Sequence, residues 1–312
     1  MIIKIGSLNM RNWSYSSRKD FQKIAEIIVS EEFDVIALQE ILSEGKGVQR
    51  MLESEVKKEL YNWDVRFGFP YESSDQDKLS DMINRDKRGE GYAFLWNKTR
   101  FKLAEFKKMG EKREFEPRII NSMQNDVHAD CSIFARTPFY IRLQPIYGGF
   151  FELRLINIHI YYGKNSLSDI NKRRLEYKIL ANKIYPGIAK RTYGNNRFPY
   201  TIAMGDYNLN IPTPLVTPQT PNASIDEMLD EIVTVQEKLT TLSGTDTSNS
   251  NIPNSGKYAN NYDHFTYSLK SSPFKSVFYD RVDAVEKYCS GDYSFYRDNI
   301  SDHLPIKMIV DI

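Results

Sequence analysis

The chain has 312 residues, 41% of them hydrophobic and 27% charged, a composition typical of a globular protein long enough to bury a substantial core. Its formal net charge of +1 argues neither for nor against a nucleic-acid partner, so any basic face must be local. Two cysteines, Cys131 and Cys289, make neither a disulfide framework nor a zinc pattern, and no apolar stretch is long enough to span a bilayer.

Apolar patterning through the first third of the chain predicts alternating strands and helices. Strands are expected at 2–8, 33–40, 64–70 and 91–96, and helices at 18–30 and 47–61. The first strand begins at once, without a signal-peptide pattern, so we expect a cytoplasmic protein, or a secreted one if a leader has been removed. Residues 73–88 are polar and charge-rich, and an exposed loop is expected there.

The rest of the chain continues this alternation. Strands are expected at 101–106, 132–143, 151–159, 200–203, 262–268, 277–285 and 306–312, and helices at 169–184, capped by Asp169, and at 225–239. Segments 211–223 and 243–261 are rich in turn-forming and polar residues and are expected to be irregular, while 111–128 is ambiguous. With no repeat and no linker between two cores, the sequence favours one domain over 1–312, built as a layered sandwich.

Polar groups stand at the ends of several apolar segments. They are Asn9, Glu40, His159, Asp206 with Asn208, and Asp302 with His303. A carboxylate or imidazole at the end of a buried strand costs free energy unless it is paired or binds a ligand. Any one of these endings is more often a turn, a solvated strand end or a core histidine, but five in one chain favour a shared site.

The five segments together resemble the endonuclease/exonuclease/phosphatase superfamily, the DNase I-like fold. The matching pieces, in the family's order, are Ser7-Leu8-Asn9, Ala37-Leu38-Gln39-Glu40, Asn157-Ile158-His159-Ile160, Met204-Gly205-Asp206-Tyr207-Asn208 and Ser301-Asp302-His303-Leu304-Pro305. They span nearly the whole chain. The resemblance implies an α/β fold, a four-layer α/β sandwich in which two mixed β-sheets pack face to face with helices outside and the site lies at one rim.

Four further segments look most similar to the DNase I branch. They are Asn9-Met10-Arg11, Glu90 to Leu95, Phe134 to Phe139, and Tyr262-Asp263-His264, for which Tyr279-Asp280-Arg281 is a rival. The chain departs from that branch at Leu42, where the branch has an arginine, and at Arg88, where it has a tyrosine that contacts the DNA groove. The small disulfide loop after the Gly-Asp-x-Asn segment is also missing.

The resemblance implies a divalent-cation site. Glu40 would supply a carboxylate for Mg²⁺ or Mn²⁺, with help from Asn9 and Asp302, and Ca²⁺ is a further candidate. Asp206 and Asn208 would hold a second cation, or orient the attacking water and a phosphate oxygen. Whether one or two metals bind is left open.

The catalytic roles implied by the resemblance fall to two histidines. His303 is the candidate general base for water, with Asp263 fixing its tautomer. His159 would face the phosphate from the other side, with Glu90 behind it. Arg11 and Arg136 would bind flanking phosphates, since a guanidinium matches phosphate oxygens. His128 and His264 receive no role.

Hydrolysis of a phosphoester is therefore expected, with two classes of substrate. A Mg²⁺-dependent endonuclease cutting DNA, with RNA as a further substrate, is favoured by Arg11, Arg136 and the match at 134–139. The alternative is a phosphatase or phosphodiesterase acting on an inositol phosphate, a phospholipid or another small phosphoester, which the near-neutral charge and Leu42 leave open. A relative that binds without catalysis is disfavoured by both histidines. We expect the protein to be a monomer and to bind DNA as its substrate.

Overall fold

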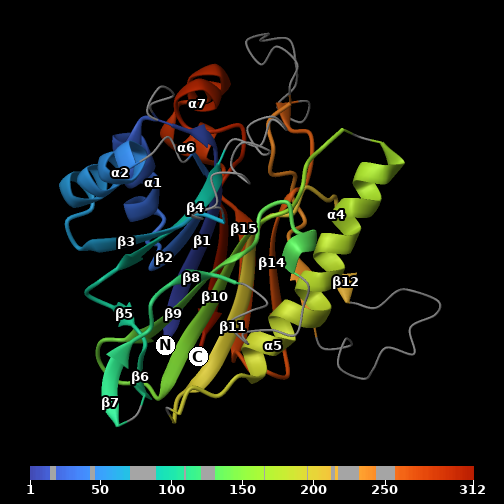
Figure 1. The fold of residues 1–312 in the computed structure, drawn as a ribbon. Coiled ribbons are helices and arrows are strands. Elements are labelled where there is room, and N and C mark those ends of the chain that lie inside the picture. Colours follow the sequence, from blue (N-terminus) through green and yellow to red (C-terminus); the bar gives the residue numbers. More distant parts are fainter. Residues whose placement is uncertain are drawn as a thin grey trace.

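Two mixed β-sheets pack face to face, and helices cover the outer side of each (Figure 1). The computed structural model describes residues 1–14, 19–42, 46–70, 89–108, 110–120, 131–164, 166–194, 196–211, 215–216, 232–243 and 257–312. The architecture confirms the four-layer α/β sandwich predicted from the sequence. In the described part of the chain, no helix has the length and apolar character needed to cross a membrane.

The first sheet brings the two ends of the chain together. Its strands lie in the order β15 (Ser276–Arg281), β16 (Ile306–Asp311), β1 (Ile2–Trp13), β2 (Val35–Leu42), β4 (Glu90–Asn97) and β3 (Trp63–Gly68). Strands β1 and β2 are parallel, and the other neighbours are antiparallel. The helices on its outer side are α1 (Phe21–Ser30), α2 (Lys46–Glu59), α6 (Ala284–Tyr288) and α7 (Tyr293–Asn299), and apolar residues of these helices share a buried cluster with the sheet.

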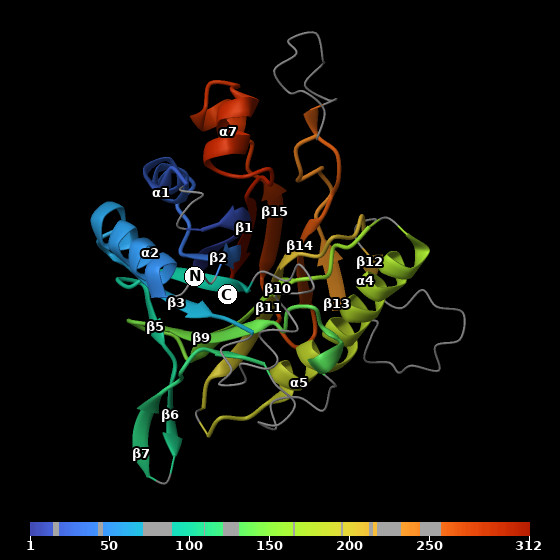
Figure 2. The same cartoon turned by 45° about the horizontal axis from the view of Figure 1, so that its top comes forward.

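The outer side of the second sheet is covered by helices from the middle of the chain. Its strands lie in the order β12 (Leu215–Val216), β13 (Ile232–Val235), β14 (Asp263–Ser268), β11 (Phe198–Asp206), β10 (Phe151–His159), β9 (Phe139–Pro145) and β5 (Phe101–Leu103), with β8 (Arg118–Ile119) also paired to β9. Its outer side is covered by three consecutive helical segments, which are α4 (Leu167–Ile179), a π-helical turn (Leu180–Ile184) and α5 (Tyr185–Lys190). Figure 2 shows the hairpin of β6 (Glu105–Lys108) and β7 (Glu111–Glu114) projecting away from the sheets.

Two parallel strand pairs determine where the site lies. Strands β1 and β2 run side by side in one sheet and β10 and β11 in the other, so the four carboxyl ends can meet at one rim. A buried polar bridge joins the sheets below that rim: Gln39 donates to Asn157 at 2.7 Å and to Ser7 at 3.0 Å. Asn157 in turn donates to the backbone carbonyls of Leu38 and Ala93. Because buried polar groups need specific partners, this bridge fixes the relative position of the two sheets.

Several expected elements differ in the structure. The helix expected at 225–239 is wrong at Ile232–Val235, which is strand β13, because four consecutive β-branched residues pair with β14 and are buried. The strand expected at 132–143 begins only at Phe139, after a 3-10 turn at Cys131–Ile133. The strand expected at 277–285 gives way to helix α6.

One helix end and one whole helix also differ from the prediction. Ser166, not Asp169, is the N-cap of α4, and its side chain accepts from the backbone N–H of Asp169. Helix α7 was not predicted from the sequence. The expected loop at 73–88, most of 211–223, residues 225–231 and most of 243–261 lie outside the described residues.

Candidate active site

Left-handed backbone conformations concentrate at this rim. Arg11, Asn12, Glu40 and Asn208 have φ angles of 48°, 54°, 57° and 51°, although none is a glycine. The register of β1 against β2 slips between Asn9 and Trp13, and the register of β2 against β4 slips between Leu38 and Ile41, around Glu40. Such bulges turn side chains out of the regular alternation, and strained residues of this kind cluster at functional sites.

Glycine is required one residue before Asp206. Gly205 has a φ angle of 146°, and a Cβ atom there would lie 1.9 Å from the carbonyl oxygen of Ile158 on neighbouring strand β10. The close approach of β10 and β11 leaves His159 and Asp206 as paired neighbours at the ends of two parallel strands. The predicted Gly-Asp-x-Asn turn therefore positions a carboxylate beside an imidazole.

Glu40 and Asp206 face each other across Asn9. The side-chain nitrogen of Asn9 lies 2.9 Å from Oε1 of Glu40 and 2.9 Å from Oδ2 of Asp206. The side-chain oxygen of Asn9 accepts from the backbone N–H of Arg11, which fixes this orientation of the amide. The backbone N–H of Asn12 donates to the other oxygen of Glu40 at 2.7 Å. Asn9 therefore turns its nitrogen, and not the oxygen expected of a metal ligand, toward the two carboxylates.

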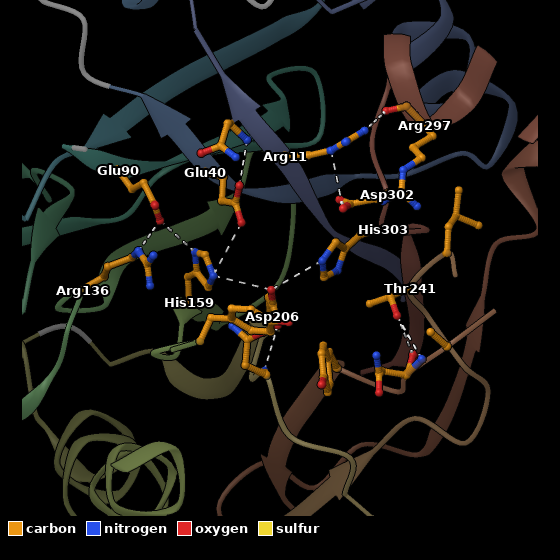
Figure 3. Close-up of a pocket in the computed structure, with 17 residues that line it drawn as sticks. Arg11, Glu40, Glu90, Arg136, His159, Asp206, Thr241, Arg297, Asp302 and His303 are labelled. Atoms are coloured by element: carbon orange, nitrogen blue, oxygen red, sulfur yellow. Dashed lines mark hydrogen bonds and ion pairs between the residues drawn. The ribbon is translucent and has the colours of Figure 1, made fainter. Parts of the chain in front are cut away.

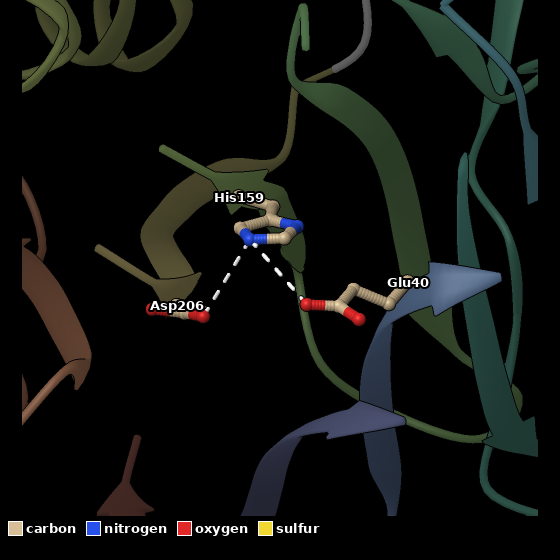
Figure 4. Close-up of side chains that lie close together, drawn as sticks. All are labelled: Glu40, His159 and Asp206. Carbon is tan, nitrogen blue, oxygen red and sulfur yellow. Dashed lines mark ion pairs between the residues drawn. The ribbon is translucent and has the colours of Figure 1, made fainter. Parts of the chain in front are cut away.

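His159 contacts three carboxylates. Its Nε2 lies 3.7 Å from Oε1 of Glu40 and 3.6 Å from Oδ2 of Asp206 (Figure 4), while its Nδ1 lies 3.4 Å from Oε2 of Glu90. Burial raises the pKa of Glu90, but His159 and Arg136 outweigh it and hold that pKa at about 2. Glu90 is therefore an anion near neutral pH, and it lies behind His159.

His303 pairs with Asp263 on the opposite side of Asp206. Nδ1 of His303 lies 2.8 Å from Oδ2 of Asp263, and its Nε2 lies 3.7 Å from Oδ2 of Asp206. Burial opposes protonation of His303, but Asp263 and Asp206 outweigh it and raise its pKa well above the ordinary value. Asp206 itself has a raised pKa because it is buried, against the opposing charges of His303 and His159. The rival for Asp263, Asp280, forms a surface ion pair with Lys238 and lies elsewhere.

The two arginines expected to bind phosphate are both engaged with carboxylates. Arg136 lies in the loop before β9 and pairs through Nε with Glu90. Arg11 lies 3.5 Å through Nε from Asp302, and its Nη1 donates to the carbonyl of Arg297. Asp302, expected as a metal ligand, therefore faces Arg11 and does not belong to either group of converging metal-binding side chains found in the described residues.

These groups line one pocket of about 460 Å³ (Figure 3). This volume lies within the range of small-ligand sites. Asn208 also lines it; its backbone N–H donates to Asp206 and its side-chain nitrogen to the carbonyl of Ile160. The pocket includes residues that the sequence did not single out: Asn12, Tyr162, Thr241, Leu242, Ala259, Asn260 and Arg297. Most come from loops or from a helix that apolar patterning did not predict, so the sequence carried no signal for them.

Of the two remaining histidines, His264 is described by the structure and does not line the pocket. His264 is buried, and its Nε2 lies 2.9 Å from the carbonyl of Leu209 and 3.0 Å from that of Asn261. Burial lowers the pKa of His264 to about 4, so it is a neutral structural residue. His128 and Arg88 lie outside the described residues.

The donor set fits a hard divalent cation. One candidate group is Glu40, His159 and Asp206, and a second is Asp206, Asp263 and His303; within each, one ligand atom per residue lies within 4.8 Å of the others. Glu40 and Asp206 bring two negative charges close together in a buried region, with only the Asn9 amide between them. A bound cation would compensate these charges. Because His303 is already bound to Asp263, the group around Glu40 is the better candidate.

Comparisons with known proteins bear on the fold. The chain matches TDP2 from D. rerio complexed with single strand DNA product (TM-score 0.55, 16% identity, covering 100% of this chain and 99% of that one). It also matches ANGEL2, a 2′,3′-cyclic phosphatase (TM-score 0.55, 13%, 99% and 95%). A third match is an endonuclease/exonuclease/phosphatase family protein from Leptotrichia buccalis (TM-score 0.51, 15%, 99% and 100%). Neither a scan of protein-family models nor a search of curated proteins found a match. At these identities the likeness shows the fold.

Proposed function

We propose that this chain, which has the fold of the endonuclease/exonuclease/phosphatase superfamily, is a metal-dependent phosphoester hydrolase that cleaves phosphodiester bonds of nucleic acid, with DNA as the first substrate. One observation carries the proposal. Two histidine–carboxylate pairs, His159 with Glu90 and His303 with Asp263, face each other with Asp206 between them. Opposed imidazoles in a polar pocket suit proton transfer on both sides of a phosphate.

His303 is the proposed general base. Asp263 accepts a hydrogen bond from Nδ1–H of His303 and fixes the tautomer, so Nε2 is the atom that faces the pocket and would take a proton from water. Asp206 would hold that water, since its Oδ2 lies 3.7 Å from Nε2 of His303. The backbone N–H of Asn208 donates to Asp206 and would keep this carboxylate in place. Buried carboxylates at this distance also stabilise the imidazolium that forms.

His159 is the proposed partner on the other side of the phosphate. Its Nε2 would donate to a phosphate oxygen or to the leaving group, while its Nδ1 faces Glu90. Arg136 neutralises Glu90 and lines the pocket, so it would reach phosphate only with the part of its guanidinium that Glu90 does not use.

Glu40 and Asp206 are proposed to hold a divalent cation, Mg²⁺ or Mn²⁺, with Ca²⁺ as a further candidate. Asn9 would hold the two carboxylates in place, through the contacts that it already makes. When bound, the cation would compensate negative charge, both on the phosphate under attack and on the carboxylates that raise the pKa of His303.

The choice of nucleic acid rests on arginines at both sides of the pocket. Arg136 stands beside His159, and Arg11 stands beside Asp302. Cationic groups flanking a hydrolytic centre suit a substrate with phosphates on both sides of the scissile bond. The TDP2 neighbour complexed with single strand DNA product is consistent with this choice. A small phosphoester remains the second candidate, because the ANGEL2 neighbour is described as a 2′,3′-cyclic phosphatase.

An assay with a panel of substrates separates these candidates. Supercoiled plasmid, single-stranded DNA, RNA and small phosphoesters are incubated with Mg²⁺ or Mn²⁺, beside His159→Ala, His303→Ala and an EDTA control. The proposal predicts cleavage of DNA that EDTA abolishes and that each substitution lowers by about 10²–10⁴-fold. Release of phosphate from small esters, with DNA left intact, would favour the second candidate. No hydrolysis of any substrate would overturn both.

We also propose that residues 1–312 form one catalytic domain that acts as a monomer. The site draws on Glu40 near one end of the chain and His303 near the other, so neither half of the sequence contains it alone. Light scattering during size-exclusion chromatography would test this, with the mass of a single chain as the expected result.

A further inference from the structure

Arg297 differs from the other arginines in the pocket. Arg136 is paired with Glu90, and Arg11 with Asp302. Within the described parts of the chain, Arg297 also lines the pocket but has no carboxylate within ion-pair distance. It therefore brings to the pocket a positive charge without a carboxylate partner, whereas Arg11 and Arg136 are each paired with one.

The position of Arg297 is fixed from two directions. Its Nη1 donates to the backbone carbonyl of Ser243 at 2.7 Å, and its own backbone carbonyl accepts from Nη1 of Arg11 at 2.6 Å. These contacts hold helix α7 against the strand end that carries Asn9 and Arg11. A guanidinium held in this way has lost much of its freedom before any ligand arrives, which lowers the entropic cost of binding.

Helix α7 is also tied directly to the catalytic turn. The hydroxyl of Tyr296, which is fully buried, donates to the backbone carbonyl of His303 at 2.9 Å. Asp292 caps the start of the helix by accepting from the backbone N–H of Phe295. Arg297 is the next residue after Tyr296, so its position relative to His303 is determined by buried contacts.

The free donors of Arg297 suit an anion. A guanidinium has five N–H donors, and the contact to Ser243 uses one nitrogen. In Figure 3 the side chain of Arg297 extends from α7 beside Asp302, while Arg136 lies on the other side of His159 and Asp206. The two arginines therefore stand on opposite sides of the proposed reaction centre.

We propose that Arg297 forms an anion subsite that binds the phosphate next to the scissile one in a DNA substrate, on the α7 side of the pocket. This inference rests on the proposed function, because it assumes that the scissile phosphate lies between His159 and His303. Arg11 then acts as a positioning residue, held by Asp302 and supporting α7 through the carbonyl of Arg297. A substrate with only one phosphate cannot use this subsite, so Arg297 selects for a polynucleotide.

Binding of single-stranded DNA tests the inference independently of catalysis. Fluorescence anisotropy of a short labelled oligonucleotide, in Ca²⁺ or EDTA, is measured over a range of salt concentrations for the wild type, Arg297→Gln and Arg297→Lys. Arg297→Gln should weaken binding about 10-fold. It should also reduce the slope of log K against log salt concentration by about 0.7, which corresponds to the loss of one phosphate contact on a single strand. Arg297→Lys should retain the salt dependence and lose part of the affinity.

Arg113→Gln is the matched control, since it removes one positive charge from the exposed β6–β7 hairpin, where Arg113 pairs with Glu111. It should leave both binding quantities unchanged. As a second measurement, turnover of bis(p-nitrophenyl) phosphate is compared with cleavage of the oligonucleotide. Arg297→Gln should lower kcat/KM for the oligonucleotide about 10-fold more than for the small diester.

The outcomes separate the two proposals. If the wild type cleaves DNA but Arg297→Gln binds it as tightly and with the same salt dependence, the subsite is wrong and the proposed function stands. Equal losses on both substrates would also overturn the subsite, because they would indicate a general distortion of the pocket. If the wild type neither cleaves nor binds DNA, both proposals fail.

Discussion

Nδ1 of His303 lies 2.8 Å from Oδ2 of Asp263, and the Asp263 side chain is completely buried. These two residues come from β14 in one sheet and from the turn before β16 in the other. Contact between an imidazole and a buried carboxylate across the sandwich means that the tautomer of His303 depends on the packing of both sheets. The pair therefore links the fold directly to the proposed chemistry.

Replacing Asp263 with Asn should strongly reduce catalysis while preserving the fold. An amide is similar in size but does not supply the charge that fixes the His303 tautomer, so kcat should fall by about 10²–10⁴-fold. The measurement is kcat on DNA with saturating Mg²⁺, beside the melting temperature. Asp280→Asn is the control, because Asp280 pairs with Lys238 at the surface. Retention of full activity in Asp263→Asn would contradict the assigned pairing.

Glu90 and His159 should behave as one unit. Glu90 touches His159 and Arg136 and lies behind the imidazole, so its effect on catalysis should pass through that ring. We expect Glu90→Gln to lower kcat by about 10²-fold. In the double variant with His159→Ala, kcat should equal that of His159→Ala alone within about threefold. If kcat of the double variant instead fell by the product of the two single-variant factors, Glu90 would act on the reaction independently of His159.

Gly205→Ala should destabilise the fold. The added Cβ would lie 1.9 Å from the carbonyl of Ile158, and the φ angle of 146° is unfavourable for alanine. The expected loss in free energy of unfolding is about 3 kcal/mol or more, measured by urea denaturation. Gly110→Ala is the matched control: its φ is also positive, but a Cβ there meets nothing within 4 Å, so a loss of about 1 kcal/mol is expected. Equal losses would show that the close approach of β10 and β11 is unimportant.

Glu31 gives a stability prediction that depends on pH. Burial raises the pKa of Glu31, but hydrogen bonds from Lys287, Lys307 and Tyr288 outweigh it and hold the pKa at about 2, below the ordinary value of 4.5. Because the folded-state pKa is depressed, these contacts stabilise the protein fully above about pH 4.5, and the contribution is lost as the pH falls toward 2.

The Glu31→Gln variant should therefore lose about 2 kcal/mol of stability at neutral pH and approach the wild type as the pH falls from 4.5 toward 2. The measurement is urea unfolding across that range. Glu26→Gln, on the exposed side of the same helix, should show little difference from the wild type at any pH. A loss in Glu31→Gln that does not shrink in acid would exclude an ionic origin.

Much of the site could be predicted because its residues follow strongly apolar strands. A buried strand that carries Glu40 or His159 at or near its end is unusual, and parallel neighbours bring such ends together. The glycine before Asp206 could also be predicted, since only that residue allows the backbone to turn there. The alternation of strands and helices predicted a layered sandwich, and the family resemblance implied its four-layer form.

Other features could not be predicted, because they depend on long-range contacts. The residues of β13 have apolar neighbours at helical spacing, and only pairing with β14 makes them a strand. The pairing of Arg11 with Asp302 and the orientation of the Asn9 amide are set by side chains far apart in the chain. Arg297 lies on α7, a short helix that the sequence pattern did not reveal.

The position of a bound metal shows directly whether Glu40 and Asp206 form the cation site. Crystals grown with Mn²⁺ give an anomalous signal that locates the ion without reference to any substrate. The account predicts one strong peak within coordination distance of Glu40 and Asp206, and its loss in Glu40→Gln crystals. A strong peak elsewhere on the molecule, with both carboxylates free of metal, would contradict the account.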